Sequence, residues 1–251
     1  MSDTTLALIG GTGLNALGSV LDTLVIETPF GEPSAPIRVI RDDGIRLLFL
    51  ARHGSPHRFP PHRVNYRANI WALKEAGADH VLAVSAVGGI AEHCGPGSLH
   101  ALDQIVDYTW GREHSYSLTE DDDLQHVDFS YPYAGPLRQQ LLKASAQVNI
   151  TLVDGGCVGV FQGPRLETAA EIERAKRDGC TVAGMTSMPE AGLARELSLD
   201  YAGIAVVSNW GAGVVTGTIS EANIAETLKE PMTRVSALIE RTAELLSGAS
   251  A

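Results

Sequence analysis

The sequence lacks three features that define large classes of proteins: paired cysteines, long apolar runs and excess positive charge. Its three cysteines, Cys94, Cys157 and Cys180, are odd in number, widely spaced and form no Cys-x-x-Cys pair. They predict neither a disulfide framework nor a zinc site and favour the reducing cytoplasm. Residues 1–5 carry no basic region, and the apolar stretch that follows is only Leu6 to Ile9. We therefore expect neither secretion nor insertion in a membrane.

Positive charge is scarce relative to negative charge. The chain has 19 Lys and Arg against 30 Asp and Glu, a formal net charge of -11. Such a field repels phosphate backbones and anionic membranes, so nucleic acid is not an expected partner. The 251 residues show no internal repeat, low-complexity segment or linker, and they suffice for one large core. We predict a single domain over residues 1–251.

Short apolar runs alternate with segments of helical spacing along the whole chain. This alternation predicts an α/β fold with a mixed, mostly parallel central sheet flanked by helices. The expected strands cover residues 6–9, 37–40, 45–50, 81–84, 105–108, 150–153, 158–161, 181–183 and 201–207. The expected helices cover residues 64–76, 136–147, 168–178, from 189 to about 197, and 220–246.

The segment Leu50 to Ala72 contains the most informative charged cluster. Arg52, His53 and His57 follow an apolar strand and are expected at its carboxyl end, where open α/β sheets bind ligands. A guanidinium fork beside an imidazole suits a small oxyanion such as phosphate or a carboxylate. A surface loop with solvated basic residues is the alternative.

A glycine-rich turn, Gly10 to Gly13, follows the first predicted strand. Thr12 adds a hydroxyl to the backbone donors of this turn, as a phosphate cradle requires. With Ala16 the segment also matches the Gly-x-Gly-x-x-Ala dinucleotide fingerprint, but only residues 14–23 remain for the helix that this fingerprint needs. A nicotinamide oxidoreductase and an ordinary turn therefore stay open as alternatives.

Two further segments are expected to be irregular. Ser85 to Gly89 reads as a second glycine-rich loop at a strand end, able to meet the Arg52 loop if their strands are neighbours. Residues 110–133 read as a long loop of the kind that forms lids or contact surfaces. His126 lies in this loop, where a solvated histidine without a role is the plain alternative.

Five motifs together resemble the trimeric purine nucleoside phosphorylases, and within them the methylthioadenosine phosphorylase branch. They are Gly10-Gly-Thr-Gly-Leu14, Ala51-Arg-His-Gly54, Val64-Asn-Tyr-Arg-Ala-Asn-Ile-Trp71, Gln162-Gly-Pro-Arg-Leu-Glu167 and Met185-Thr-Ser-Met-Pro-Glu190. Their order matches the family over nearly the whole chain. The resemblance implies that phosphate attacks the anomeric carbon of a purine nucleoside and the base departs, without a metal or an organic cofactor.

The resemblance also implies roles for individual residues. The phosphate contacts carried over by motif are Thr12, Arg52, His53, Ser85, Ala86 through its N–H, and Thr186. His57 matches a catalytic histidine near the sugar and the phosphate, and Met185 matches a residue against the ribose. Leu166, Gly211 and Ile224 complete the nucleoside-binding set, and His126 matches a residue donated by a neighbouring subunit, which implies a homotrimer.

The base pocket departs from the methylthioadenosine branch at Glu167 and Asn209. That branch has a serine and an aspartate at these positions, whereas the glutamate and asparagine of this chain resemble the 6-oxopurine phosphorylases. A carboxylate accepts the N1–H of hypoxanthine but faces a bare acceptor in adenine, and an Asn amide can donate to O6 and accept from a protonated N7. For both residues a purely structural role is the alternative.

Glu221 leaves the 5′ side of the pocket ambiguous. It falls where hydroxymethyl nucleosides meet a histidine and methylthio nucleosides meet an apolar residue, and it also suits the first turn of a helix. The predicted activity is phosphorolysis of S-methyl-5′-thioinosine or another 6-oxopurine nucleoside. The alternatives are S-methyl-5′-thioadenosine phosphorylase, the nicotinamide oxidoreductase and a binding protein without turnover.

Overall fold

The structure, a computed structural model, describes residues 4–11, 14, 18–117 and 126–248. Within these residues eleven strands are hydrogen-bonded into one sheet. They are β1 (Thr5–Gly10), β2 (Asp22–Leu24), β3 (Ile37–Asp43), β4 (Ile45–Ala51), β5 (His80–Gly89), β6 (Leu99–Ala101), β7 (Gln104–Asp107), β8 (Val153–Asp154), β9 (Cys157–Val160), β10 (Val182–Gly184) and β11 (Asp200–Trp210).

The sheet branches at the long strand β5. Its main path runs β2-β3-β4-β1-β5-β10-β9-β7, while β11 pairs with the other side of β5 and leads to β6 and β8. The pairs β1–β4, β1–β5, β5–β11, β9–β10, β7–β9 and β6–β8 are parallel. Four pairs are antiparallel, which confirms the predicted mixed, mostly parallel sheet.

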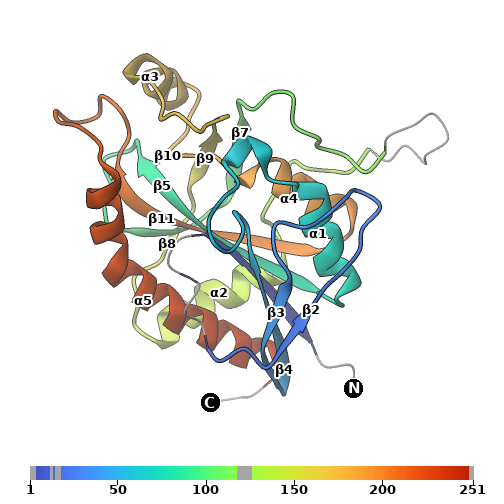
Figure 1. The fold of residues 1–251 in the computed structure, drawn as a ribbon. Coiled ribbons are helices and arrows are strands. Elements are labelled where there is room, and N and C mark those ends of the chain that lie inside the picture. The colour runs from blue at the N-terminus through green and yellow to red at the C-terminus, as the bar shows by residue number, and fades with distance from the viewer. Residues whose placement is uncertain (1–3, 12–13, 15–17, 118–125, 249–251) are drawn as a thin grey trace.

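Helices cover both faces of this sheet (Figure 1). They are α1 (Tyr66–Glu75), α2 (Pro136–Gln147), α3 (Ala169–Arg177), α4 (Ser187–Glu196) and α5 (Glu221–Leu246). Alternate residues of β1 point to opposite faces, so Ala7 and Ile9 pack with α1 and α4, while Leu6 and Leu8 pack with α2 and α5. All four β1 residues are fully buried, as expected of a strand that is covered on both sides.

The helices occur close to where the sequence places them, and α1, α3 and α5 begin at a side-chain cap. Thr168 and Glu171 form the reciprocal capping box of α3, and Ser220 Oγ accepts a hydrogen bond from the Asn223 N–H at the start of α5. Helix α1 begins two residues later than predicted, since the Asn65 side chain accepts from the Ala68 N–H and makes Asn65 the N-cap.

Two details of the prediction are wrong. Ser85 to Gly89 is strand, not loop, because β10 and β11 pair with this half of β5 from its two sides. The strand expected over 150–153 is reduced to Val153–Asp154. The structure also bears on the nicotinamide alternative: β2 runs antiparallel to β3 at the edge of the sheet, whereas a dinucleotide fold needs its second strand parallel to β1 and beside it. The nicotinamide alternative loses its structural support.

No helix in the described part of the chain is both long enough and apolar enough to cross a membrane.

Candidate functional site

A cavity of about 720 Å³ lies at the carboxyl ends of β1 and β4, along the second halves of β5 and β11. It is lined by predicted site residues from six separate segments of the chain. These are Arg52, His53, His57, Ser85, Ala86, Leu166, Glu167, Met185, Thr186, Asn209, Gly211, Glu221 and Ile224. The structure therefore brings together residues that are up to 172 positions apart, from Arg52 to Ile224. A volume of this size is ordinary for a site that encloses a small molecule.

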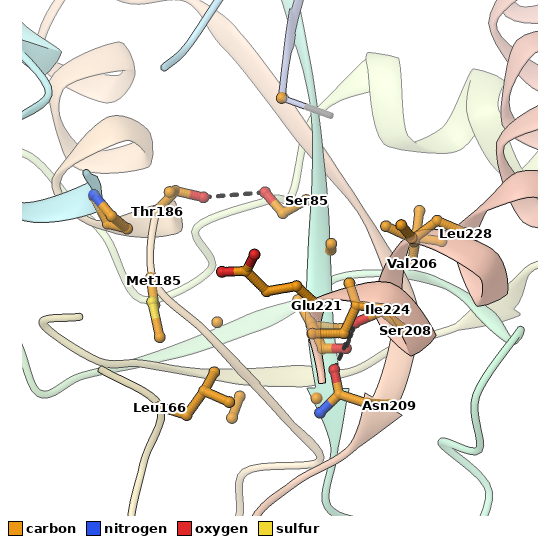
Figure 2. Close-up of a pocket in the computed structure, with 18 of the residues that line it drawn as sticks. Ser85, Leu166, Met185, Thr186, Val206, Ser208, Asn209, Glu221, Ile224 and Leu228 are labelled. Carbon is orange, nitrogen blue, oxygen red and sulfur yellow. Dashed lines mark hydrogen bonds between the residues drawn. The ribbon is translucent and has the colours of Figure 1, made fainter. Parts of the chain in front are cut away.

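One end of the cavity gathers small donors. The hydroxyl groups of Ser85 in β5 and Thr186, the residue before α4, lie 3.1 Å apart (Figure 2). Ala86 follows Ser85 in the same strand, and the imidazole of His53 lies nearby after β4. Uncharged hydroxyl and N–H groups that converge on one point form a suitable cradle for an oxyanion.

His53 is held as a neutral imidazole in one tautomer. Its Nδ1 lies 2.8 Å from the carbonyl oxygen of Phe59, which can only accept, so Nδ1 carries the proton. Burial, and after it the charge of Arg52, lower the pKa of His53 to about 4. The ring stacks on His57, with ring centroids 4.5 Å apart. At neutral pH the free Nε2 of His53 is therefore a hydrogen-bond acceptor.

Arg52 is not a solvated surface residue. Its side chain is only 2% exposed, and its guanidinium pairs with the carboxylate of Glu190, at 2.7 Å from Nε and 2.8 Å from Nη2. Nη1 also donates to the Val84 carbonyl at 3.0 Å. Burial alone would lower the pKa of Arg52, but the carboxylate of Glu190 raises it above its usual value. The guanidinium is charged, and its charge is compensated.

The opposite end of the cavity contains Asn209. Its side-chain Nδ2 donates to the Trp210 carbonyl at 2.8 Å, and its Oδ1 accepts from the Ser208 hydroxyl at 2.7 Å (Figure 2). The pairing register of β11 with β5 shifts between Val207 and Asn209. Because of this bulge, Asn209 is the residue that pairs with Gly88. The amide is therefore fixed with one N–H and one oxygen lone pair left for a ligand.

Glu167 reaches the cavity from the segment between β9 and α3. Burial raises the pKa of its carboxyl group above the usual value, with a smaller contribution in the same direction from the charge of Glu171. Glu171 itself is occupied by the capping box and by Arg165, as the capping-box spacing predicts. Glu167 thus remains available to a ligand. Leu166, 44% exposed, lies on the same side of the cavity as Met185 in Figure 2.

The start of α5 forms an apolar wall with one carboxylate on it. Ile224, Leu228 and Met232 line the cavity from successive turns of the helix. Glu221 extends from the first turn into the middle of the cavity (Figure 2), and its carboxylate has no hydrogen bond to another described side chain. A ligand that fills the cavity would meet both the apolar wall and this charge.

Two predicted site residues are not placed in the cavity. Thr12 lies outside the described residues, although its neighbours Gly11 and Leu14 line the cavity. His126 is described and exposed, and it is not among the described residues that line the cavity of its own chain. Within the described ranges no group of three or more His, Cys, Asp or Glu side chains could hold a metal ion.

The sequence analysis missed two residues that contact the site. Glu190 pairs with Arg52 from the first turn of α4, where an acidic residue ordinarily signals only a favourable helix start. Ser208 holds the Asn209 amide, although a serine next to a polar strand-end residue gives no signal of its own in one sequence. Glu190 acts through Arg52, which is distant in sequence, and Ser208 acts through Asn209, whose orientation depends on the bulge in β11.

Comparison with known proteins bears on this site. Residues 5–244 match the family described as the phosphorylase superfamily. A probable S-methyl-5'-thioinosine phosphorylase of Xanthomonas campestris is 49% identical over 245 residues, 97% of each chain. A 6-oxopurine nucleoside phosphorylase of Pyrococcus furiosus is 38% identical over 233 residues, 90% of this chain and 86% of that one.

A solved structure is also similar throughout. The methylthioadenosine phosphorylase of Schistosoma mansoni in complex with adenine superposes with a TM-score of 0.92 and 30% sequence identity. The match covers 99% of this chain and 93% of that one.

Proposed function

Because the chain belongs to the phosphorylase superfamily, we propose that it cleaves the N-glycosidic bond of a 6-oxopurine nucleoside with phosphate, S-methyl-5′-thioinosine foremost. The products are the free base and the 1-phosphate of the sugar. One observation carries the proposal: a single cavity is lined by the Ser85 and Thr186 hydroxyls and by the Glu167 and Asn209 side chains, with Asn209 at the end away from the two hydroxyls (Figure 2). The cavity thus offers an anion cradle and a polar purine pocket.

The residues of the base pocket suit a departing 6-oxopurine. Glu167 would accept the N1–H of the base, and the free N–H of Asn209 would donate to O6 or its oxygen would accept from a protonated N7. When an oxygen of phosphate bonds to the anomeric carbon, the carbon–nitrogen bond breaks and its electron pair passes to the base. Hydrogen bonds that stabilise this charge at N7 and O6 lower the barrier.

Phosphate would be held at the other end of the cavity by donors from Thr12, Arg52, Ser85, Ala86 and Thr186, and by His53, whose Nε2 would accept from the P–OH of hydrogen phosphate. Orienting the attacking oxygen toward the sugar converts a bimolecular encounter into a positioned attack. His57, stacked on His53, would lie between the sugar and the phosphate, with Met185 against the ribose. Leu166, Gly211, Glu221 and Ile224 would enclose the nucleoside.

We propose further that the chain works as one domain in a homotrimer, in the cytoplasm, with phosphate as co-substrate and no cofactor. His126 is exposed in its own chain, as a residue must be if it completes a neighbour's pocket. Dilution of the protein below the dissociation constant of the trimer should then lower the activity per subunit. A fully active monomer, measured by light scattering under assay conditions, would argue against the shared site.

A panel of nucleosides tests the proposed activity. S-methyl-5′-thioinosine, inosine and S-methyl-5′-thioadenosine are incubated with the protein, with and without phosphate, and free base is quantified by chromatography. We expect release of hypoxanthine only when phosphate is present. Release without phosphate would indicate a hydrolase, and no release from any member of the panel would refute the proposal. Equal cleavage of S-methyl-5′-thioadenosine would favour the 6-aminopurine alternative.

A further inference from the structure

A buried polar cluster lies behind the hydroxyl end of the cavity. It consists of Arg52, Glu190 and Tyr201, which are 2%, 0% and 5% exposed. Both carboxylate oxygens of Glu190 accept from the Arg52 guanidinium, and the Tyr201 hydroxyl donates to Oε1 of Glu190 at 2.9 Å. An ion pair at this depth is costly to desolvate unless its geometry is good and its remaining atoms are bonded. This cluster meets both conditions.

The donors of Arg52 are almost completely used. Of its five N–H groups, Nε and one Nη2 hydrogen go to Glu190, and one Nη1 hydrogen goes to the Val84 carbonyl. The second Nη2 hydrogen faces the Ile9 carbonyl at 3.5 Å. One N–H of Nη1 remains for a ligand. Glu190 therefore fixes which single donor Arg52 presents to the cavity.

The cluster also joins the segments that carry the proposed phosphate contacts. Arg52 bonds to the carbonyl of Ile9, two residues before Gly11, and to that of Val84, next to Ser85. Glu190 lies four residues after Thr186, in the first turn of α4, and the non-helical residue Met188 stands between them. Since side chains in a buried network have few alternative rotamers, a change in the pair would shift these three segments relative to one another.

We propose that Glu190, braced by Tyr201, is a positioning residue for the phosphate site, orienting Arg52 and the segments around it. This inference rests on the proposed phosphorylase function. Glu190 touches neither substrate, and it acts only through Arg52. Because its charge cancels that of Arg52, phosphate is held mainly by neutral donors whose spacing the cluster sets.

Glu190→Gln and Tyr201→Phe test the proposal, with Tyr133→Phe as a matched control. Tyr133 is 1% exposed and its ring centroid lies 5.8 Å from that of Tyr201, but the hydroxyl that donates to Glu190 is that of Tyr201 and not that of Tyr133. For each variant, kcat and the KM values for phosphate and for nucleoside are measured. Equilibrium binding of hypoxanthine reports separately on the base pocket.

We expect Glu190→Gln to lower kcat/KM for phosphate by roughly 10- to 100-fold, because a displacement of the phosphate-binding groups by about 1 Å can lower the rate by up to about 100-fold. Tyr201→Phe should lower it by a smaller factor, and Tyr133→Phe should leave it within about twofold. Binding of hypoxanthine should be unchanged in all three variants. Glu190→Asp should recover part of the loss, because it restores the charge but not the reach.

The proposal would be overturned if Glu190→Gln had the same kcat/KM for phosphate as the wild type. It would also be overturned if the kcat/KM for phosphate and the affinity for hypoxanthine fell by the same factor, since this would indicate general damage. If Glu190→Gln does not fold, the comparison of Tyr201→Phe with Tyr133→Phe decides, and equal phosphate kinetics in these two would overturn it. A wild-type protein that releases no base with phosphate would instead refute the proposed function on which the inference depends.

Discussion

Selectivity between 6-oxopurines and 6-aminopurines should depend on the ionisation of Glu167. An ionised carboxylate can accept the N1–H of hypoxanthine, but it opposes the bare N1 of adenine with no proton between them. The Asn209 amide cannot relieve the conflict by flipping, because Ser208 and the Trp210 carbonyl hold its two ends. An unpaired buried polar contact costs about 1 to 3 kcal/mol, which corresponds to roughly a 5- to 150-fold preference for the 6-oxo base.

The preference should also depend on pH in a defined direction. Burial raises the pKa of Glu167, so its carboxyl group takes up a proton at a higher pH than an exposed glutamate does. The protonated carboxyl can donate to N1 of adenine, and the preference for 6-oxopurines should therefore shrink as the pH falls through this raised pKa. Above it, the preference should be constant.

Glu167→Gln is the matched perturbation, since the amide has the same shape and can either donate or accept. It should reduce the ratio of kcat/KM for S-methyl-5′-thioinosine over S-methyl-5′-thioadenosine toward one and remove its pH dependence. Asn209→Asp combined with Glu167→Ser should reverse the preference, because the new carboxylate accepts from the adenine amino group. Equal kcat/KM values for the two nucleosides in the unmodified protein at neutral pH would refute this reasoning.

Three further outcomes are expected. Glu221→Leu should raise the ratio of kcat/KM for methylthio over hydroxymethyl nucleosides by roughly 5- to 30-fold, because it extends the apolar wall and the added contact contributes about 1 to 2 kcal/mol. An unchanged ratio would exclude a role of Glu221 on the 5′ side. His53 has a folded pKa of about 4 against 6.5 unfolded, so its contribution to stability is present above pH 6.5 and lost as the pH falls toward 4. The thermal midpoint of the wild type should consequently fall more steeply over this window than that of His53→Gln, and parallel curves would count against a buried neutral imidazole. Thr168→Ala should lower the free energy of unfolding in urea by about 1 kcal/mol through loss of the α3 cap, whereas an unaltered midpoint would mean that the cap is dispensable.

The sequence by itself determined most of the secondary structure and named many of the residues that line the cavity. Short apolar runs and segments of helical spacing are local signals, so β1, the β3–β4 hairpin, α2, α3 and α5 begin and end close to where they were predicted. The motifs containing Arg52, Thr186 and Glu167 named residues that line one cavity. These residues were found because their chemistry and spacing are visible within short segments.

Only the tertiary structure decided how those residues are used. Ser85 lies in a strand rather than a loop, because β10 and β11 pair with the second half of β5, and no local pattern specifies such partners. Arg52 appears in the sequence as a free cation. In the fold it is neutralised by Glu190, 138 positions away.

The orientation of Asn209 likewise follows from a register shift between β11 and β5 and from the adjacent Ser208 hydroxyl. Charge compensation, burial and register are properties of pairs that are distant in sequence. They arise only when the sheet is assembled, and for that reason one sequence could name the residues of this site but not their protonation states or their partners.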